Sequence, residues 1–233
     1  MAYPLPSMKD LANRVLRECG RPVKTTFVAT TDPQAIMAYD GVLDGYADIW
    51  FRNRWEWQRY EASVPMVAGS DEYPLPANFQ RMAVAPWFGP LRSPGQLTEL
   101  APETFYKMIA PMDPTVQGSP QFYTIDHTTL KLYPAPSSNS VISQPILTFQ
   151  YWMELPARKT LAQESQPLNY MPSTFEEVLI AYAKAKLKQY LEFPDWDADK
   201  KDYERKLLIM IQRDRQVRVA PTLRTPFEGV SEW

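Results

Sequence analysis

Residues 55–64 read Trp-Glu-Trp-Gln-Arg-Tyr-Glu-Ala-Ser-Val, and the spacing of the apolar residues changes within this stretch. Upstream, from about residue 33, apolar side chains recur every three or four positions, which is typical of a helix with one buried face. From residue 59, polar and apolar residues alternate singly, which is typical of a half-buried strand. The stretch therefore separates a helical part of the chain from a β-rich part that begins near residue 57.

Two helices are predicted before this boundary. Ser7 can cap the first, which ends at Gly20. Asp32 and Pro33 supply the cap and the first-turn proline of the second, which we expect to run to about Arg54. Both helices carry one apolar face, so each needs a packing partner elsewhere in the chain.

Two glycines interrupt the second predicted helix. Gly41 and Gly45 lie four residues apart, and each weakens the helix by roughly 1 kcal/mol relative to alanine. Glycine at this spacing permits another element to approach closely, so we predict a close helix crossing here.

The middle of the chain is predicted to be rich in strands. After a turn at residues 68–71, strand-like runs occupy residues 81–85, 122–125, 129–133 and 146–153. Residues 102–110 are predicted to form a short helix, and residues 134–140, Pro-Ala-Pro-Ser-Ser-Asn-Ser, a loop.

The chain returns to helix after Pro172. Residues 173–176, Ser-Thr-Phe-Glu, match a capping box, and Pro194 separates this helix from a second one. We therefore predict an α+β protein. Its helical bundle is formed by residues 1–56 and 156–219, its inserted β-rich domain by residues 57–155, and its extended C-terminal tail by residues 220–233.

The composition argues against several classes of protein. A formal net charge of -2 and a pI near 5.6 give no basic excess for gripping nucleic acid by its phosphates. One cysteine, Cys19, excludes an internal disulfide, and with one histidine, His127, it leaves too few ligands for the usual zinc sites. We find neither a secretory leader nor an apolar run of about 18 residues. We expect no cofactor, no metal, no membrane insertion, and synthesis in the cytoplasm.

One acidic stretch partly matches a calcium-binding loop. Residues 195–200 read Asp-Trp-Asp-Ala-Asp-Lys, with alternate carboxylates. The sixth position is Lys200 rather than glycine, however, and the twelfth is Lys206 rather than glutamate. We favour the alternative, in which the carboxylates stabilise the start of a helix.

Arginines alternate with tryptophans in residues 52–59, a pattern that binds single-stranded nucleic acid in other proteins. The arginines are Arg52, Arg54 and Arg59. We favour the alternative in which Trp55 and Trp57 pack at the junction between helix and strand.

The sequence offers no set of catalytic residues. Cys19 lies on the apolar face of the first helix, which favours a buried thiol over a nucleophile. His127 lies in a predicted turn without a nucleophile to pair with, and the adjacent Glu176 and Glu177 point apart on a helix. Neither a nucleophile elbow nor a phosphate-binding glycine loop occurs. We therefore expect a protein that is not an enzyme.

Several short motifs follow one another in a defined order along the chain. A helix closing in Trp55-Glu56-Trp57 is followed by Ala68-Gly69, by Tyr73-Pro74-Leu75-Pro76 and later by Pro120-Gln121-Phe122-Tyr123-Thr124-Ile125. Two helices from residue 173 close the pattern. This arrangement resembles bacteriophage head-to-tail adaptors, the tail tubular or gatekeeper-type adaptors of short-tailed phages.

The resemblance implies a structural role in the virion. Such a protein would be made in the cytoplasm of the host bacterium and would form a ring of twelve at the head-to-tail interface. Its partners would be the portal protein above it and the tail nozzle or tube protein below it. Double-stranded DNA would pass through the ring without specific binding. A slightly acidic chain suits such a conduit, because each phosphate neutralised by the wall would slow the DNA.

The C-terminal tail is the predicted docking element. It carries four apolar anchors on a proline-broken, extended segment, namely Leu223, Phe227, Val230 and Trp233. We hypothesise that this tail docks on the portal, and the alternative is a frayed terminus.

One alternative function comes from a different class of protein. A β-sandwich module could bind carbohydrate or another ligand on a cell surface and use its tryptophans and tyrosines as stacking platforms. A ring on the portal would support the adaptor, whereas a monomer that retains glycans would support the binding module.

Overall fold

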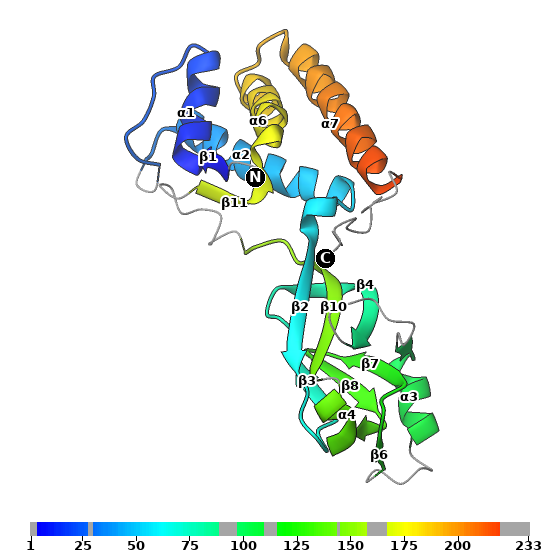
Figure 1. Cartoon of the computed structure of the whole chain (residues 1–233). Helices are drawn as coiled ribbons and strands as arrows, with labels where there is room; N and C mark the ends of the chain where they lie inside the picture. Colours follow the sequence, from blue (N-terminus) through cyan, green and yellow to red (C-terminus); the bar gives the residue numbers. More distant parts are fainter. Residues whose placement is uncertain are drawn as a thin grey trace, which may run out of the picture. The chain divides into compact units, whose positions relative to one another are not determined.

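The computed structural model of the chain describes residues 4–27, 30–88, 97–109, 116–143, 145–157 and 167–219, with backbone only for residues 167–169 and 217–219. Helices and sheets are both present, as an α+β protein requires. The chain forms two compact units (Figure 1), one from Met1–Glu56 with Ala157–Trp233 and the other from Trp57–Pro156. None of the described helices is both long and apolar enough to cross a membrane.

The first unit begins with the two predicted helices. α1 spans Met8–Glu18, and the Ser7 hydroxyl accepts a hydrogen bond from the Asp10 backbone N–H at 3.2 Å. α2 spans Pro33–Arg52, and the Asp32 carboxylate accepts one from the Gln34 N–H at 3.0 Å. Both predicted N-terminal caps are confirmed. The apolar face of α1 is buried and consists of Met8, Leu11, Ala12, Val15 and Leu16.

Two later helices complete this unit. α6 spans Glu176–Tyr190 and packs on α1, α2 and α7, which spans Trp196–Val219. The predicted close crossing is confirmed, because α2 and α6 meet at the two glycines. A Cβ atom would lie 3.3 Å from the Ala183 Cα at Gly41, and 2.8 Å from the Tyr182 Cδ1 at Gly45.

The predicted capping box before α6 is wrong. Residues Ser173–Phe175 form a 3-10 turn (η2), and no described side chain caps the N-terminus of α6. The Glu176 carboxylate instead accepts a hydrogen bond from Arg14 of α1, at 2.6 Å. A contact between helices has replaced the local cap.

A short sheet in this unit had no counterpart in the prediction. β1, Pro4–Ser7, pairs antiparallel with β11, Pro167–Pro172. Both strands contain prolines, which cannot donate to a sheet ladder. Strands of this composition lack the single alternation of polar and apolar residues that predicts a strand from sequence.

The second unit contains three sheets. The first has the order β2-β10-β4, the second β3-β8-β7-β5, and the third pairs β6 with β9. Their bounds are Arg59–Pro65 (β2), Glu72–Pro74 (β3), Phe79–Phe88 (β4), Thr98–Glu99 (β5), Gln117–Gly118 (β6), Phe122–Asp126 (β7), Thr129–Tyr133 (β8), Ala135–Pro136 (β9) and Ile146–Met153 (β10). A 3-10 turn (η1, Glu56–Gln58) precedes β2, and two short helices, α3 (Pro102–Ile109) and α4 (Ser138–Ser143), accompany the strands. The core includes Tyr73, Tyr123, Leu130, Leu147 and Phe149.

The predicted loop at residues 134–140 is wrong. β9 and the start of α4 occupy most of it. The Ser137 hydroxyl accepts a hydrogen bond from the Ser140 N–H at 3.2 Å, as a helix cap does, and the Ser140 hydroxyl donates to the Gly118 carbonyl at 3.1 Å. The small polar residues that indicated a loop therefore cap a helix and hold it against β6.

Candidate interaction surfaces

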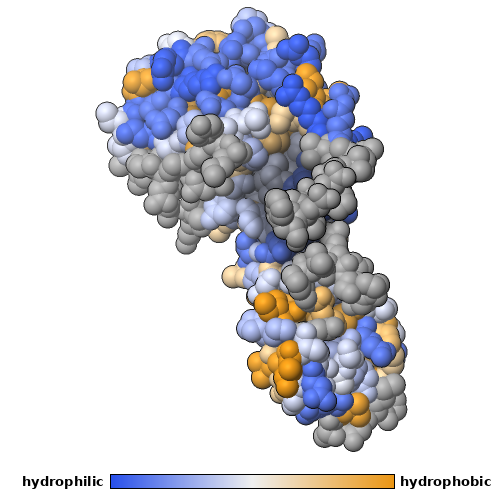
Figure 2. All heavy atoms as spheres, in the orientation of Figure 1, coloured by the Kyte–Doolittle hydropathy of each residue, from blue (hydrophilic) through white to orange (hydrophobic). Residues whose placement is uncertain are grey.

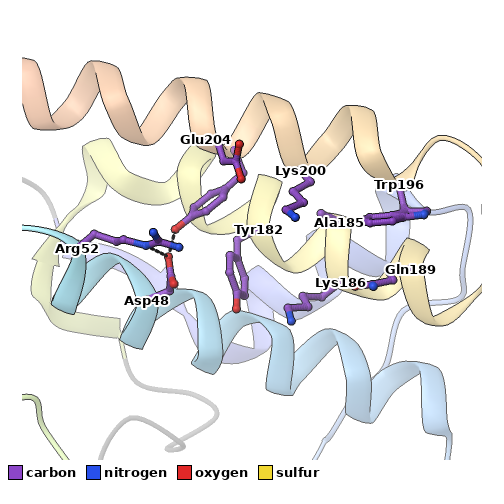
Figure 3. A pocket seen from close by; sticks show the side chains of 10 residues that line it. Asp48, Arg52, Tyr182, Ala185, Lys186, Gln189, Trp196, Lys200 and Glu204 are labelled. Carbon is purple, nitrogen blue, oxygen red and sulfur yellow. Dashed lines mark hydrogen bonds and ion pairs between the residues drawn. The ribbon is translucent and has the colours of Figure 1, made fainter.

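A groove lies between α2 and α7 in the helical unit, and α6 forms its floor (Figure 3). Its volume is about 330 Å³. A second hollow of about 320 Å³ adjoins it on α2, shares Asp48, Arg52 and Tyr182 with it, and includes Asp44 and Phe51. Together they form an open surface along three helices, which we call the α2/α7 groove.

One end of the groove is held by a polar cluster. The Asp48 carboxylate of α2 accepts hydrogen bonds from Arg52 Nε at 3.1 Å and from the Tyr203 hydroxyl of α7. Burial and the nearby charge of Asp48 raise the pKa of Tyr203 well above its ordinary value, so its hydroxyl stays protonated and donates. This cluster ties α7 to α2 across the groove.

Aromatic rings and lysines line the rest of the groove. The Tyr182 and Tyr203 rings pack edge to face, with centroids 5.0 Å apart. Lys186 Nζ lies 5.7 Å from the Tyr182 ring centroid, and Lys200 Nζ lies 5.9 Å from that of Trp196. Among the described residues, no carboxylate lies within ion-pair distance of either lysine. Two lysines that form no ion pair with a described carboxylate thus face half-buried aromatic rings in one groove.

The lysines on the opposite side of α6 are paired. Lys188 Nζ lies 2.7 Å from Asp199 Oδ2 and also contacts Asp195, while Lys184 Nζ lies 3.1 Å from Asp199 Oδ1. The hydrogen bond from Lys188 lowers the pKa of Asp195 below its ordinary value. These ion pairs attach the start of α7 to α6, so the carboxylates of the calcium-like stretch bind lysines. No group of three or more metal-ligating side chains occurs in the described part of the chain.

The β-rich unit carries an exposed apolar patch. Val67, Ile142 and Ile146 are 58%, 81% and 45% exposed. The Met66 N–H donates to the Pro145 carbonyl at 2.9 Å and Ile146 pairs with Pro65, which places Val67 near Ile146. Ile142 lies on α4, four residues before Ile146 in the chain. Figure 2 shows hydrophobic residues gathered on this unit beside the end of β2 and α4. We call these three residues the β-unit patch.

The comparison with protein families decides the class of the protein. The model of the family described as SU10 adaptor protein matches residues 6–225. The chain belongs to the SU10 adaptor protein family. No curated protein matches the chain.

Family membership confirms the resemblance to phage head-to-tail adaptors and favours it over the carbohydrate-binding alternative. The SU10 adaptor family is a structural phage family and not an enzyme class. Membership makes this protein a virion component that interacts with other head and tail proteins. The surfaces of interest are therefore those that can contact other proteins.

Several residues singled out in the sequence of this SU10 adaptor lie where they have structural roles. Cys19 is buried, and burial raises the pKa of its thiol, which disfavours the reactive thiolate. His127 is exposed in the turn between β7 and β8 at φ 53°, with Nε2 at 3.7 Å from an Asp126 carboxylate oxygen. Trp55 is fully buried, and its Nε1–H donates to the Ile49 carbonyl at 2.6 Å. Its ring is therefore unavailable for stacking on a base.

The four anchors predicted in the C-terminal tail, Leu223, Phe227, Val230 and Trp233, lie outside the described residues. Sequence reasoning missed the α2/α7 groove, because its lining comes from helices far apart in the chain. One signal was present: Tyr182, Lys186 and Gln189 follow one another at helical spacing along α6.

Proposed function

We propose that this SU10 adaptor is one subunit of a ring of twelve between the portal and the tail nozzle or tube. The family match over residues 6–225 is the observation that carries the proposal. DNA passes through the ring, and each subunit lines the conduit without binding the DNA specifically. The formal net charge of -2 supports this, because a wall that does not neutralise phosphates lets DNA slide.

Two surfaces support a role in assembly. The α2/α7 groove lies in the helical unit and the β-unit patch in the other, so each compact unit offers a surface of its own. A ring subunit needs surfaces for two neighbours and for the components above and below it. The apolar β-unit patch suits a contact that stays closed after assembly.

We also propose that the chain is divided into a helical module and an inserted domain. Residues 1–56 and 156–219 act as one helical module, and residues 57–155 act as an inserted domain. The compactness of the two units supports this. Limited proteolysis of the full chain tests it: we expect the first cuts near residues 57 and 155, and early cuts inside the sheets would contradict it.

Binding of the chain to the portal protein tests its proposed position between portal and tail. The full chain is mixed with purified portal, and the mass of the complex is measured by native mass spectrometry. We expect twelve copies of the chain on each portal ring. A chain that stays monomeric with portal and instead retains immobilised glycans would support the binding-module alternative.

The C-terminal tail is proposed to dock on the portal through Leu223, Phe227, Val230 and Trp233. These anchors are replaced together by serine in the full chain. Loss of co-sedimentation with portal, with an unchanged melting temperature, is the expected result. Undiminished binding would contradict the docking role.

A further inference from the structure

The sheet formed by β2, β10 and β4 has one long and regular edge. β2 is an edge strand of seven residues, and its register with β10 runs from Arg59 to Pro65 without a bulge. It lies beside β10 on the side away from β4 (Figure 1). Proteins usually shorten, bulge or cover such an edge, because its open backbone groups can pair with another chain. In the described part of the chain, β2 has neither a bulge nor a strand on its outer side.

The other described sheet edges are short or irregular. β3 and β5 have three and two residues, and β6 and β9 have two each. The register of β4 shifts at several positions, and its Pro86 carbonyl already accepts a hydrogen bond from the Leu97 N–H at 3.1 Å. β1 and β11 pair irregularly and contain prolines. β2 is therefore the described edge best suited to accept a further strand.

The backbone groups of Glu61 and Ser63 point away from β10. The Met66 N–H donates to the Pro145 carbonyl at 2.9 Å, and hydrogen-bonded pairs alternate with non-bonded pairs along an antiparallel ladder. Ala62 therefore bonds β10, whereas the N–H and C=O groups of Glu61 and Ser63 face outward. Both side chains are exposed, and no other described strand pairs with this side of β2. Two backbone donors and two acceptors are thus available on the edge.

A second copy of the chain offers the same edge. Because β2 is the long, regular edge among the described strands, strand pairing between copies joins β2 to β2 in a two-fold, antiparallel contact. Centred on Ala62, this register pairs all seven residues and places Glu61 opposite Ser63 of the other copy. Centred on Glu61, it would place two carboxylates opposite each other, which destabilises a sheet. The residues of the edge therefore select the register centred on Ala62.

We propose that two copies of this chain pair through β2 before they enter a ring, antiparallel and centred on Ala62. A hydrogen-bonded pair exchanges two backbone bonds, so the two pairs of Glu61 with Ser63 supply four bonds between the copies. The pairing covers both open edges, which would otherwise accept strands without selection.

The pair is expected to be an intermediate. Neighbours in a ring are related by a repeated rotation about one axis, so a two-fold contact cannot join them. The two copies must therefore separate on assembly. A small contact held by a few backbone hydrogen bonds suits this, because each bond replaces one to water and adds little.

Replacing Ser63 by proline in the full chain tests the pairing. Proline has no N–H to donate, and the N–H of Ser63 is not used by β10, so the fold should tolerate Ser63→Pro. Ser63→Ala is the matched control, because it loses the hydroxyl contact with Thr148 at 3.2 Å but keeps the N–H. Sedimentation equilibrium measures dimerisation, and the melting temperature of each variant checks its folding.

We expect dimers of the wild-type chain and of Ser63→Ala, and a dissociation constant about tenfold or more higher for Ser63→Pro. A wild-type chain that stays monomeric at its highest soluble concentration would overturn the proposal and leave the edge to a different protein. Equal dissociation constants for the proline and alanine variants would overturn it too.

Disulfide cross-linking tests the register without disturbing the edge. Ala62 lies opposite itself in a non-hydrogen-bonded pair, where Cα atoms are about 4.5 Å apart, within reach of a disulfide. Val64 lies on the same face but opposite Tyr60, so its two copies lie about 14 Å apart. Under mild oxidation, Ala62→Cys should form a covalent dimer about tenfold or more faster than Val64→Cys. The natural Cys19 is buried and common to both. Equal rates would contradict the register.

Exchange of charge gives an independent measurement of the same register. Ser63→Glu places a second carboxylate opposite Glu61 in both pairs and should weaken the dimer. Adding Glu61→Lys makes both pairs opposite in charge and should restore it. A double variant that dimerises no better than Ser63→Glu alone would contradict the pairing of these two residues. None of these tests uses the portal, so a failure of the ring proposal leaves this inference standing.

Discussion

Replacing Gly45 by alanine tests the packing that creates the α2/α7 groove. A Cβ atom at Gly45 would lie 2.8 Å from Tyr182 Cδ1 and 3.1 Å from Cγ, which is closer than such atoms approach. Turning the ring does not relieve the contact fully, because the Tyr182 Cβ, which stays in place when the ring turns, lies only 3.3 Å from the same position. Overpacking of this kind costs about 1–3 kcal/mol, while the gain in helix propensity offsets about 1 kcal/mol. We expect Gly45→Ala to lower the free energy of unfolding by up to about 2 kcal/mol.

The control is a chain that already carries Tyr182→Ala, in which the ring that the new methyl group would contact is absent. In that background Gly45→Ala should raise the free energy of unfolding, by up to about 1 kcal/mol, because only the gain in helix propensity remains. Urea denaturation followed by circular dichroism at the helical wavelength measures both values. An equal loss of stability in the two backgrounds would refute the close approach of α2 and α6.

Three further changes probe other contacts. Trp55→Phe should lower the free energy of unfolding by about 1–3 kcal/mol, because the Ile49 carbonyl loses its buried donor; urea denaturation checks this, and an unchanged value would contradict the hydrogen bond. The free energy of unfolding of the helical unit should fall as the pH decreases below about 4. The pKa of Asp195 is lowered in the folded chain, so its ionised carboxylate stabilises the fold above the unfolded pKa. This stabilisation is lost as the carboxyl group protonates. The melting temperature, measured from pH 7 to pH 2, should depend less on pH in Asp195→Asn than in the wild-type chain. An identical pH dependence would show that the ion pair between Asp195 and Lys188 is not the cause. Ile142→Glu should leave the melting temperature unchanged but weaken association between subunits in sedimentation, whereas Val23→Glu, at an exposed apolar site of the other unit, serves as the control.

The features predicted correctly are those whose cause is local. Ser7 and Asp32 cap their helices through bonds to residues two or three positions away, so a short window of sequence contains the whole interaction. The change of period at residues 55–64 likewise appears in the structure as the end of α2, a 3-10 turn and then β2. Alternation along β7, β8 and β10 was visible because each strand has one face in the core.

The features predicted wrongly depend on distant residues. Glu176 bonds Arg14 rather than the start of its own helix, and β1 finds its partner more than 150 residues away. The small polar residues around Ser137 indicate a loop by composition, but contact with Gly118 lets them form a helix. The α2/α7 groove could not be predicted, because α2, α6 and α7 must be packed before Asp48 meets Tyr203.

The most direct test of the central claim is the number of copies of this chain on a portal ring. Native mass spectrometry of the full chain mixed with purified portal measures that number. A complex with twelve copies is the result that the adaptor role predicts. A chain that stays unbound at saturating portal, or that binds with another stoichiometry, would contradict it.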